Sequence, residues 1–287
     1  MKLRQTRATL QKRDGVKDNT PRKRSLEEVQ FLLPELLSLS PLIQAQRQPS
    51  AIYTFHVENL RELEIALANV GRLAKEEIAT RDSQNSLRSL LRLYTFLIGA
   101  WAECRLKKLL HEEYGFTATE RMAIESARSQ HQMWTKVVEH AFRKHYHIPH
   151  GNLDCSCLGD TKAAYYDQLL ASLDDELKIV IEIRNKLAHG QWRFPLNRSG
   201  TSVQADKERL ISRENLMTLQ IKYRLIGKIA DVVHDLVVSP ATFERDFSNH
   251  FALLSQARID LNRRSYEKYR DKLINARERA RMQRKNS

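Results

Sequence analysis

The sequence predicts an all-α protein, arranged as a helical bundle with basic extensions. Its commonest residues are Leu, Arg, Lys, Glu and Ala, which lose little conformational entropy in a helix. Glycine and proline are few, at 9 and 7 among 287 residues. Apolar residues recur at helical spacing through much of the chain, and no segment alternates convincingly as a half-buried strand does. These observations argue against an all-β fold and against a Gly-rich nucleotide-binding sheet.

The pattern divides the chain into three segments. Residues 1–50 form a basic arm and one short helix. We expect the first 24 residues to be disordered because they are polar and lack an apolar period. The short helix follows them and is interrupted by Pro34 and Pro41. Residues 51–238 form the helical bundle, and residues 239–287 form a long basic C-terminal helix.

The bundle is predicted to contain five helices. Asp82-Ser83 caps the start of the second helix, and Gly115 follows its end. Gly190 ends the fourth helix. Polar loops are expected over 148–160 and 194–213, and Pro240 begins the last helix, at 241–284, whose end should project from the body. The five predicted helices are His56–Thr80, Gln84–Tyr114, Thr119–His147, Thr161–His189 and Glu214–Val238.

The positive charge is concentrated at the two ends of the chain. Residues 1–25 carry a net charge of +7, residues 258–287 carry another +7, and the 232 residues between them sum to −1. Basic arms on a neutral body are typical of proteins that contact nucleic acid, because Lys and Arg release counterions from phosphates. Solvated tails that improve solubility are the simpler alternative.

Nothing in the sequence indicates a membrane protein or an exported one. No apolar run approaches the roughly 20 residues that span a bilayer, and the basic N-terminus lacks the apolar core of a secretory signal. The three cysteines, Cys104, Cys155 and Cys157, suggest no disulfide framework. We therefore expect a cytoplasmic protein.

The segment that carries the clearest chemistry is IEIRNKLAHGQW, which contains Arg184 and His189. RNA can be cut without a metal when the 2′-hydroxyl is activated, the leaving 5′-oxygen is protonated and the charge on phosphorus is stabilised. Histidine suits either proton transfer, and arginine grips phosphate oxygens through two N–H groups. Because five residues of regular helix turn about 140°, the two side chains would point apart unless the helix ends between them, which Gly190 makes plausible.

This segment resembles the Arg-(four to six residues)-His signature of the HEPN superfamily of helical domains. Asn185 after the arginine, Ala188 before the histidine and Gly190 after it agree with that resemblance, which covers roughly residues 50–238. It implies a metal-independent endoribonuclease that cuts RNA by 2′-hydroxyl transesterification, with no cofactor. It also implies a homodimer in which Arg184 and His189 of both copies line one cleft. Such nucleases often act as toxins or antiviral defence effectors, sometimes under a regulatory protein partner.

Three further residues are candidates for RNA binding or for supporting this site. The amide of Asn185 could hold the histidine tautomer or a phosphate, or could simply cap the helix, and Lys186 would add positive potential unless it is a solvated surface lysine. Glu103 is a carboxylate in an apolar helix and needs a partner, for which Arg184, Arg105 and solvent are candidates.

Three interpretations without catalysis stay open. The protein could be an antitoxin-regulated or complex subunit whose HEPN-type dimer only scaffolds assembly. The protein could be a non-catalytic helical adaptor that binds nucleic acid or a protein partner through its basic last helix. Arg184 and Asn185 could instead form only a salt bridge and a cap at the helix end, with no chemistry at His189.

The loop with His145, His147, His150, Cys155 and Cys157 raises the question of a zinc site. These are ligand types that zinc accepts, but their spacing matches no zinc module and Cys-x-Cys is tighter than the usual Cys-x2-Cys. A polar loop with incidental histidines is the preferred interpretation, so no metal is predicted.

Overall fold

The computed structural model describes residues 50–80 and 83–285, which all belong to one compact unit, Pro49–Ser287. The regular structure of this part is helical, with no strand and a single isolated bridge between Leu196 and Val203. The predicted all-α class is therefore confirmed. The basic arm and the short helix predicted before residue 50 lie outside the described residues. In the described part, no helix has both the length and the apolar character that crossing a bilayer requires.

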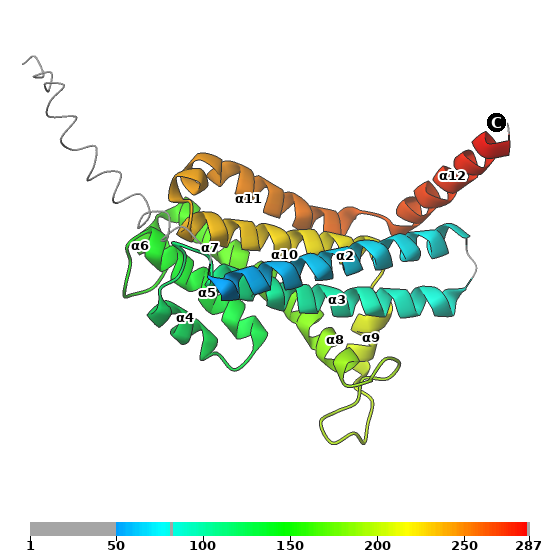
Figure 1. Cartoon of the computed structure of the whole chain (residues 1–287), viewed down its shortest axis with the longest axis horizontal. Helices are drawn as coiled ribbons and strands as arrows, with labels where there is room; N and C mark the ends of the chain where they lie inside the picture. Colours follow the sequence, from blue (N-terminus) through cyan, green and yellow to red (C-terminus); the bar gives the residue numbers. More distant parts are fainter. Residues whose placement is uncertain (1–49, 81–82, 286–287) are drawn as a thin grey trace, which may run out of the picture. The chain divides into compact units, whose positions relative to one another are not determined.

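A pair of long helices forms the frame of the molecule. α2 (Ala51–Thr80) and α3 (Gln84–Leu110) lie side by side, and α10 (Leu216–Val237) packs against both (Figure 1). α11 (Pro240–Arg263) runs along α10, and α8 (Lys178–Ala188) packs against α3. α3 thus packs against α2, α8 and α10. Its most buried residues lie in its second half, including Ile98, Ala102, Leu106, Leu109 and Leu110.

The start of α3 is as predicted, but its end is not. The Ser83 hydroxyl accepts a hydrogen bond from the Ser86 N–H at 3.3 Å, as an N-cap should. The helix stops at Leu110, before Gly115, and the chain turns through Tyr114 with a φ of 62°.

Two helices predicted as continuous are each broken by a capping serine. The segment expected at 119–147 forms α4 (Ala118–Glu125) and α5 (Gln130–His145), because the Ser129 hydroxyl accepts from the Gln132 N–H at 3.2 Å and starts a new helix. The long C-terminal helix is likewise two helices, α11 and α12 (Tyr266–Lys285). Its break follows from the extended backbone at Arg264 and a 3.3 Å hydrogen bond from the Lys268 N–H to the Ser265 hydroxyl. The residues of α12 after Ile274 are exposed, as the predicted projection requires.

The segment predicted as a helix at 161–189 is helical from end to end but contains a π-helical turn. It consists of α7 (Asp160–Ser172), the π segment η1 (Leu173–Leu177) and α8. A π turn shifts the phase of the residues after it relative to those before it, so α8 presents its own set of apolar residues to the core. Before it, the loop expected at 148–160 includes the short helix α6 (Cys155–Leu158).

The long loop predicted at 194–213 is partly helical. Its second half forms α9 (Ala205–Arg213), which packs against α8. Ile211 of α9 is buried with Ile183 and Leu187 of α8 in a small cluster separate from the main core. This cluster fixes α9 beside the helix that carries Arg184.

Candidate active site at the end of α8

Arg184 of α8 packs directly against Gly99 of α3. A Cβ placed on Gly99 would lie 2.7 Å from both Cβ and Cγ of Arg184, well inside ordinary contact distance. Glycine is therefore what allows the two helices to meet at this point. Gly99 was not predicted to matter, because its only signal in the sequence is a glycine in the middle of an apolar helix.

Arg184 is held by a carboxylate across this crossing. Its Nη2 donates to Oε2 of Glu103 at 2.7 Å, and its Nη1 donates to Oδ1 of Asn185 at 3.2 Å. Glu103 is therefore the partner of Arg184, whereas Arg105 pairs with Asp231 at 3.3 Å. The Arg184 side chain keeps 27% of its exposure, but its Nε is buried and has no hydrogen-bond partner in the described part of the chain. The guanidinium group is thus fixed in place and still reachable from solvent.

His189 lies at the C-cap of α8 and is exposed. Its backbone N–H still donates to the Asn185 carbonyl oxygen at 3.3 Å, so the helical hydrogen bonding continues through His189. α8 thus stays helical up to Ala188, the residue before His189, and the helical turn sets the two side chains about 140° apart. Among the described residues, none forms a hydrogen bond or ion pair with the His189 side chain. Within one chain, the structure does not bring these two residues together.

Gly190 ends the helix as the sequence predicts, with a φ of 74° that favours glycine. The Gln191 N–H donates to the Lys186 carbonyl at 3.0 Å, and the Gly190 N–H donates to the Leu187 carbonyl at 3.1 Å. These two bonds make a Schellman ending. The Trp192 indole N–H adds a third bond to the Leu187 carbonyl, at 3.0 Å.

Lys186 is occupied by the loop that follows. Its ammonium group donates to the Leu196 carbonyl oxygen at 2.5 Å, while the Leu196 N–H donates to Oε1 of Gln191 at 2.7 Å. Lys186 therefore ties the loop 190–204 back onto α8. The structure thus adds a contact with this loop to the positive charge expected from the sequence.

The loop with the histidines and cysteines makes other contacts. His145 Nε2 lies 2.7 Å from Oε1 of Glu244, and its Nδ1 lies 3.3 Å from the Leu236 carbonyl. Cys155 and Cys157 are exposed in α6. The ranges 50–80 and 83–285 contain no group of three or more His, Cys, Asp or Glu side chains arranged to hold a metal ion.

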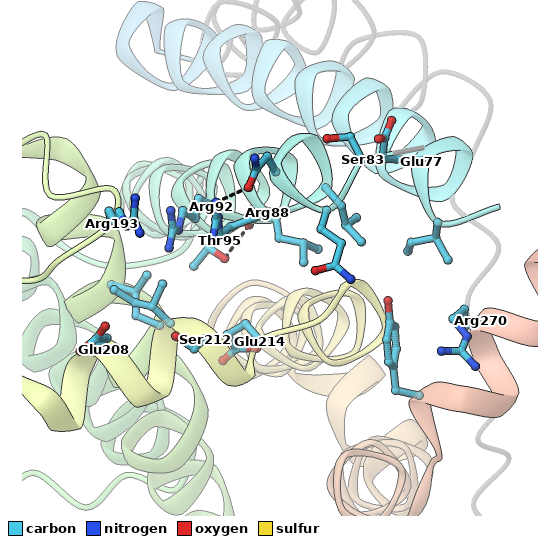
Figure 2. A pocket seen from close by; sticks show the side chains of 18 of the residues that line it. Glu77, Ser83, Arg88, Arg92, Thr95, Arg193, Glu208, Ser212, Glu214 and Arg270 are labelled. Carbon is cyan, nitrogen blue, oxygen red and sulfur yellow. Dashed lines mark hydrogen bonds between the residues drawn. The ribbon is translucent and has the colours of Figure 1, made fainter. Parts of the chain in front are cut away.

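A pocket beside α3 is a neighbour of this site and is lined by other residues. It has a volume of about 820 Å³ and lies beside the first half of α3, with Ile183 of α8 and Arg193 and Phe194 of the following loop in its wall (Figure 2). Neither Arg184 nor His189 lines it. The arginines of this pocket were not recognised from the sequence, because they come from segments that are far apart along the chain.

Comparisons of the chain with protein families, with curated proteins and with solved structures find no match. The functional assignment therefore depends on the residues of this site and on their geometry.

Proposed function

We propose that the protein is a metal-independent RNA endonuclease of HEPN type, with Arg184 and His189 as its catalytic residues. The observation that carries the proposal is the fixed position of Arg184: Glu103 and Asn185 hold its guanidinium group at a closely packed helix crossing, one turn before the exposed His189. An arginine held this way is preorganised for a phosphate, which reduces the entropy lost on binding.

The reaction is a transesterification at phosphorus. The 2′-oxygen loses its proton to a base and attacks the adjacent phosphorus, and the bond to the 5′-oxygen breaks. The leaving 5′-oxygen takes up a proton, so the products are a 2′,3′-cyclic phosphate and a 5′-hydroxyl. His189 is suited to one of the two proton transfers, and Arg184 is suited to stabilise the extra negative charge on the phosphoryl oxygens.

A homodimer supplies what one chain lacks. The two side chains diverge by about 140° on α8, so a compact site requires Arg184 of one copy beside His189 of another. The loop after His189 offers an apolar contact surface, because Trp192, Phe194 and Val203 keep 36%, 46% and 44% of their exposure. Exposed apolar side chains beside the motif support a contact between copies at this end of α8.

A second candidate function is nucleic-acid binding without cleavage. It is favoured by the pairing of Arg184 with Glu103, which offsets part of the arginine's charge, and by the exposed basic end of α12. In this case the protein would be an adaptor. The proposal of a toxin or antiviral effector, with a regulatory protein partner, applies only if cleavage occurs.

The test is cleavage of total RNA by the purified protein in EDTA. We expect cleavage by the wild-type protein, products ending in a 2′,3′-cyclic phosphate, and a decrease of at least about a hundredfold in rate for Arg184→Ala and for His189→Ala. Matched controls are Arg61→Ala and His147→Ala, which change exposed residues away from α8. Full cleavage by either α8 variant would contradict the site, and intact RNA with unchanged binding in all variants would favour the adaptor.

Mixing the two inactive variants tests the shared site directly. If Arg184 of one copy works with His189 of the other, a dimer of Arg184→Ala with His189→Ala contains one complete pair. Activity should then return to a fraction of the wild-type rate after the variants are mixed and allowed to exchange subunits. A wild-type protein that cleaves RNA as a monomer would contradict this arrangement.

A further inference from the structure

Four arginines line the pocket beside α3. Its wall is made by α2, α3, α8, the loop after α8, α9, Glu214 in the turn that follows α9, and α12. Arg88 and Arg92 lie one turn apart on α3, Arg193 comes from the loop and Arg270 from α12 (Figure 2). With a volume of about 820 Å³, it falls within the range of roughly 300–1,000 Å³ that is typical of small-molecule sites.

Three of these arginines have no carboxylate partner. Arg88, Arg92 and Arg193 form no ion pair within residues 50–80 and 83–285, although Arg88 donates to Oδ1 of Asn85 at 2.5 Å. The Nε of Arg92 is buried without a hydrogen-bond partner among the same residues. Burial, together with the nearby charges of Arg88 and Arg193, lowers the pKa of Arg92. Arg88 and Arg193 are exposed, so water screens their charges, but Arg92 is half-buried, and an anion bound beside it would offset the cost of desolvating its guanidinium group.

The opposite side of the pocket carries carboxylates. Figure 2 shows Glu208 and Glu214 across the pocket from Arg88 and Arg92. Glu214 is already engaged by Lys222 and by the Thr218 hydroxyl, but Glu208 forms no ion pair within the described ranges. The arginines and Glu208 line one cavity without touching, so each is available to a ligand placed between them.

We propose that this pocket binds a small phosphorylated ligand of the nucleotide or sugar-phosphate class. Its phosphate lies against Arg88, Arg92 and Arg193, where guanidinium groups can donate paired hydrogen bonds to phosphate oxygens. Hydroxyl groups on the sugar donate to Glu208, since a carboxylate accepts from hydroxyls but repels phosphate. This polarity gives the ligand one orientation. The proposal does not depend on Arg184 or His189.

Calorimetric titration of the full-length protein tests the proposal, with four probes: ADP, ribose 5-phosphate, inorganic pyrophosphate and adenosine. We expect saturable binding of at least one of the two sugar phosphates and of pyrophosphate, and no binding of adenosine. Preference between ADP and ribose 5-phosphate then distinguishes a nucleotide from a sugar phosphate. Absence of binding by every phosphorylated probe at millimolar concentration, or binding of adenosine alone, would overturn the proposal.

Variants then locate the binding. Arg92→Gln and Arg193→Gln should each weaken phosphate binding about tenfold or more, as expected when one charge-assisted hydrogen bond to the phosphate is removed. Glu208→Gln should weaken the sugar phosphate and leave pyrophosphate unchanged. Arg61→Gln, on the exposed surface of α2, is the matched control. Circular dichroism melts of every variant verify folding, and Arg92→Lys offers a second variant that keeps the charge but lacks the paired donors.

Wild-type affinity in both arginine variants would place the ligand elsewhere and refute the assignment. Competition with a short single-stranded RNA tests whether the pocket is instead part of an RNA-binding surface. If RNA displaces the bound phosphate probe and the arginine variants no longer bind RNA, the pocket belongs to an RNA surface and the small-ligand proposal is wrong. The cleavage assay with Arg184→Ala reports on the endonuclease independently of these results.

Discussion

Substitution of Gly99 by alanine tests the helix crossing on which the candidate active site depends. The new Cβ would lie 2.7 Å from Cβ and Cγ of Arg184, atoms next to the backbone that cannot swing aside. The helices must separate by about 1 Å to restore ordinary contact, and overpacking of this kind costs about 1–3 kcal/mol. Alanine recovers up to about 1 kcal/mol because it is a better helix former than glycine. The net expectation is a decrease of about 1 kcal/mol in the free energy of unfolding.

Gly227 provides the matched control. It also lies inside a helix, α10, but a Cβ there would be 3.7 Å from Cη2 of Trp101, which is ordinary contact. Gly227→Ala should therefore stabilise the protein by about 0.5–1 kcal/mol through helix propensity alone. Urea denaturation of both variants measures the difference, which we expect to be about 2 kcal/mol. Equal stabilisation by the two alanines would show that α3 and α8 are not this close, and would remove the basis for a fixed Arg184.

Three further outcomes follow from buried charges and from the exposed C-terminal end. Burial raises the pKa of Glu176 from 4.5 to about 7. The folded protein therefore holds the Glu176 proton more tightly than the unfolded chain, so the free energy of unfolding is highest below pH 4.5 and decreases as the pH rises through about 7. At about 1.4 kcal/mol for each tenfold change in proton affinity, the decrease is about 3 kcal/mol. Glu176→Gln should remove that pH dependence, and a wild-type-like slope of unfolding free energy against pH in the variant would contradict the prediction. The hydrogen bond to Glu112 raises the pKa of His234 above 6.5, so that pair stabilises most below pH 6.5 and weakens as the pH rises through the raised value; melting temperatures of His234→Gln should show a smaller pH dependence than those of the wild type. Deletion of residues 275–287 should weaken the salt dependence of single-stranded RNA binding. The slope of log affinity against log salt concentration, measured by fluorescence anisotropy, should become shallower by about 0.7 for each phosphate that the shortened protein no longer neutralises. An unchanged slope would show that this end does not contact RNA. The described cations removed by the deletion, all exposed, are Arg277, Arg279, Arg281, Arg284 and Lys285.

The fold class and most helix positions could be predicted from the sequence because they depend on local signals. Ser83 before α3, Gly190 after α8 and Pro240 at the start of α11 each act through their own backbone or side chain, within one turn of the helix end. The breaks at Ser129 and Ser265 were missed for a related reason. A serine inside an apolar period is compatible with both a continuous helix and a new N-cap, and tertiary contacts decide between them.

The candidate site was only half predictable. The sequence offered Glu103 as a carboxylate in need of a partner, but the choice between Arg184 and Arg105 depends on how α3 and α8 cross. That crossing is set by Gly99, whose role is visible only when the facing side chain is known. The anchoring of Lys186 by the Leu196 carbonyl was equally hidden, because it requires the loop to fold back over the helix end.

The loop after α8 joins the two proposed sites. It begins at His189, is fixed to α8 by Lys186 and Trp192, and places Arg193 in the wall of the arginine pocket. A ligand held by Arg193 therefore contacts the same segment that shapes the surroundings of His189. If such a ligand changes the affinity for RNA by some factor, RNA must change the affinity for the ligand by the same factor, since both binding events share one free-energy cycle. Titrating the pocket probe in the presence and absence of uncleaved RNA measures that factor from one side, and RNA binding with and without the probe measures it from the other. If RNA does not change the affinity for the probe, and the probe does not change the affinity for RNA, the loop holds the two sites without coupling them.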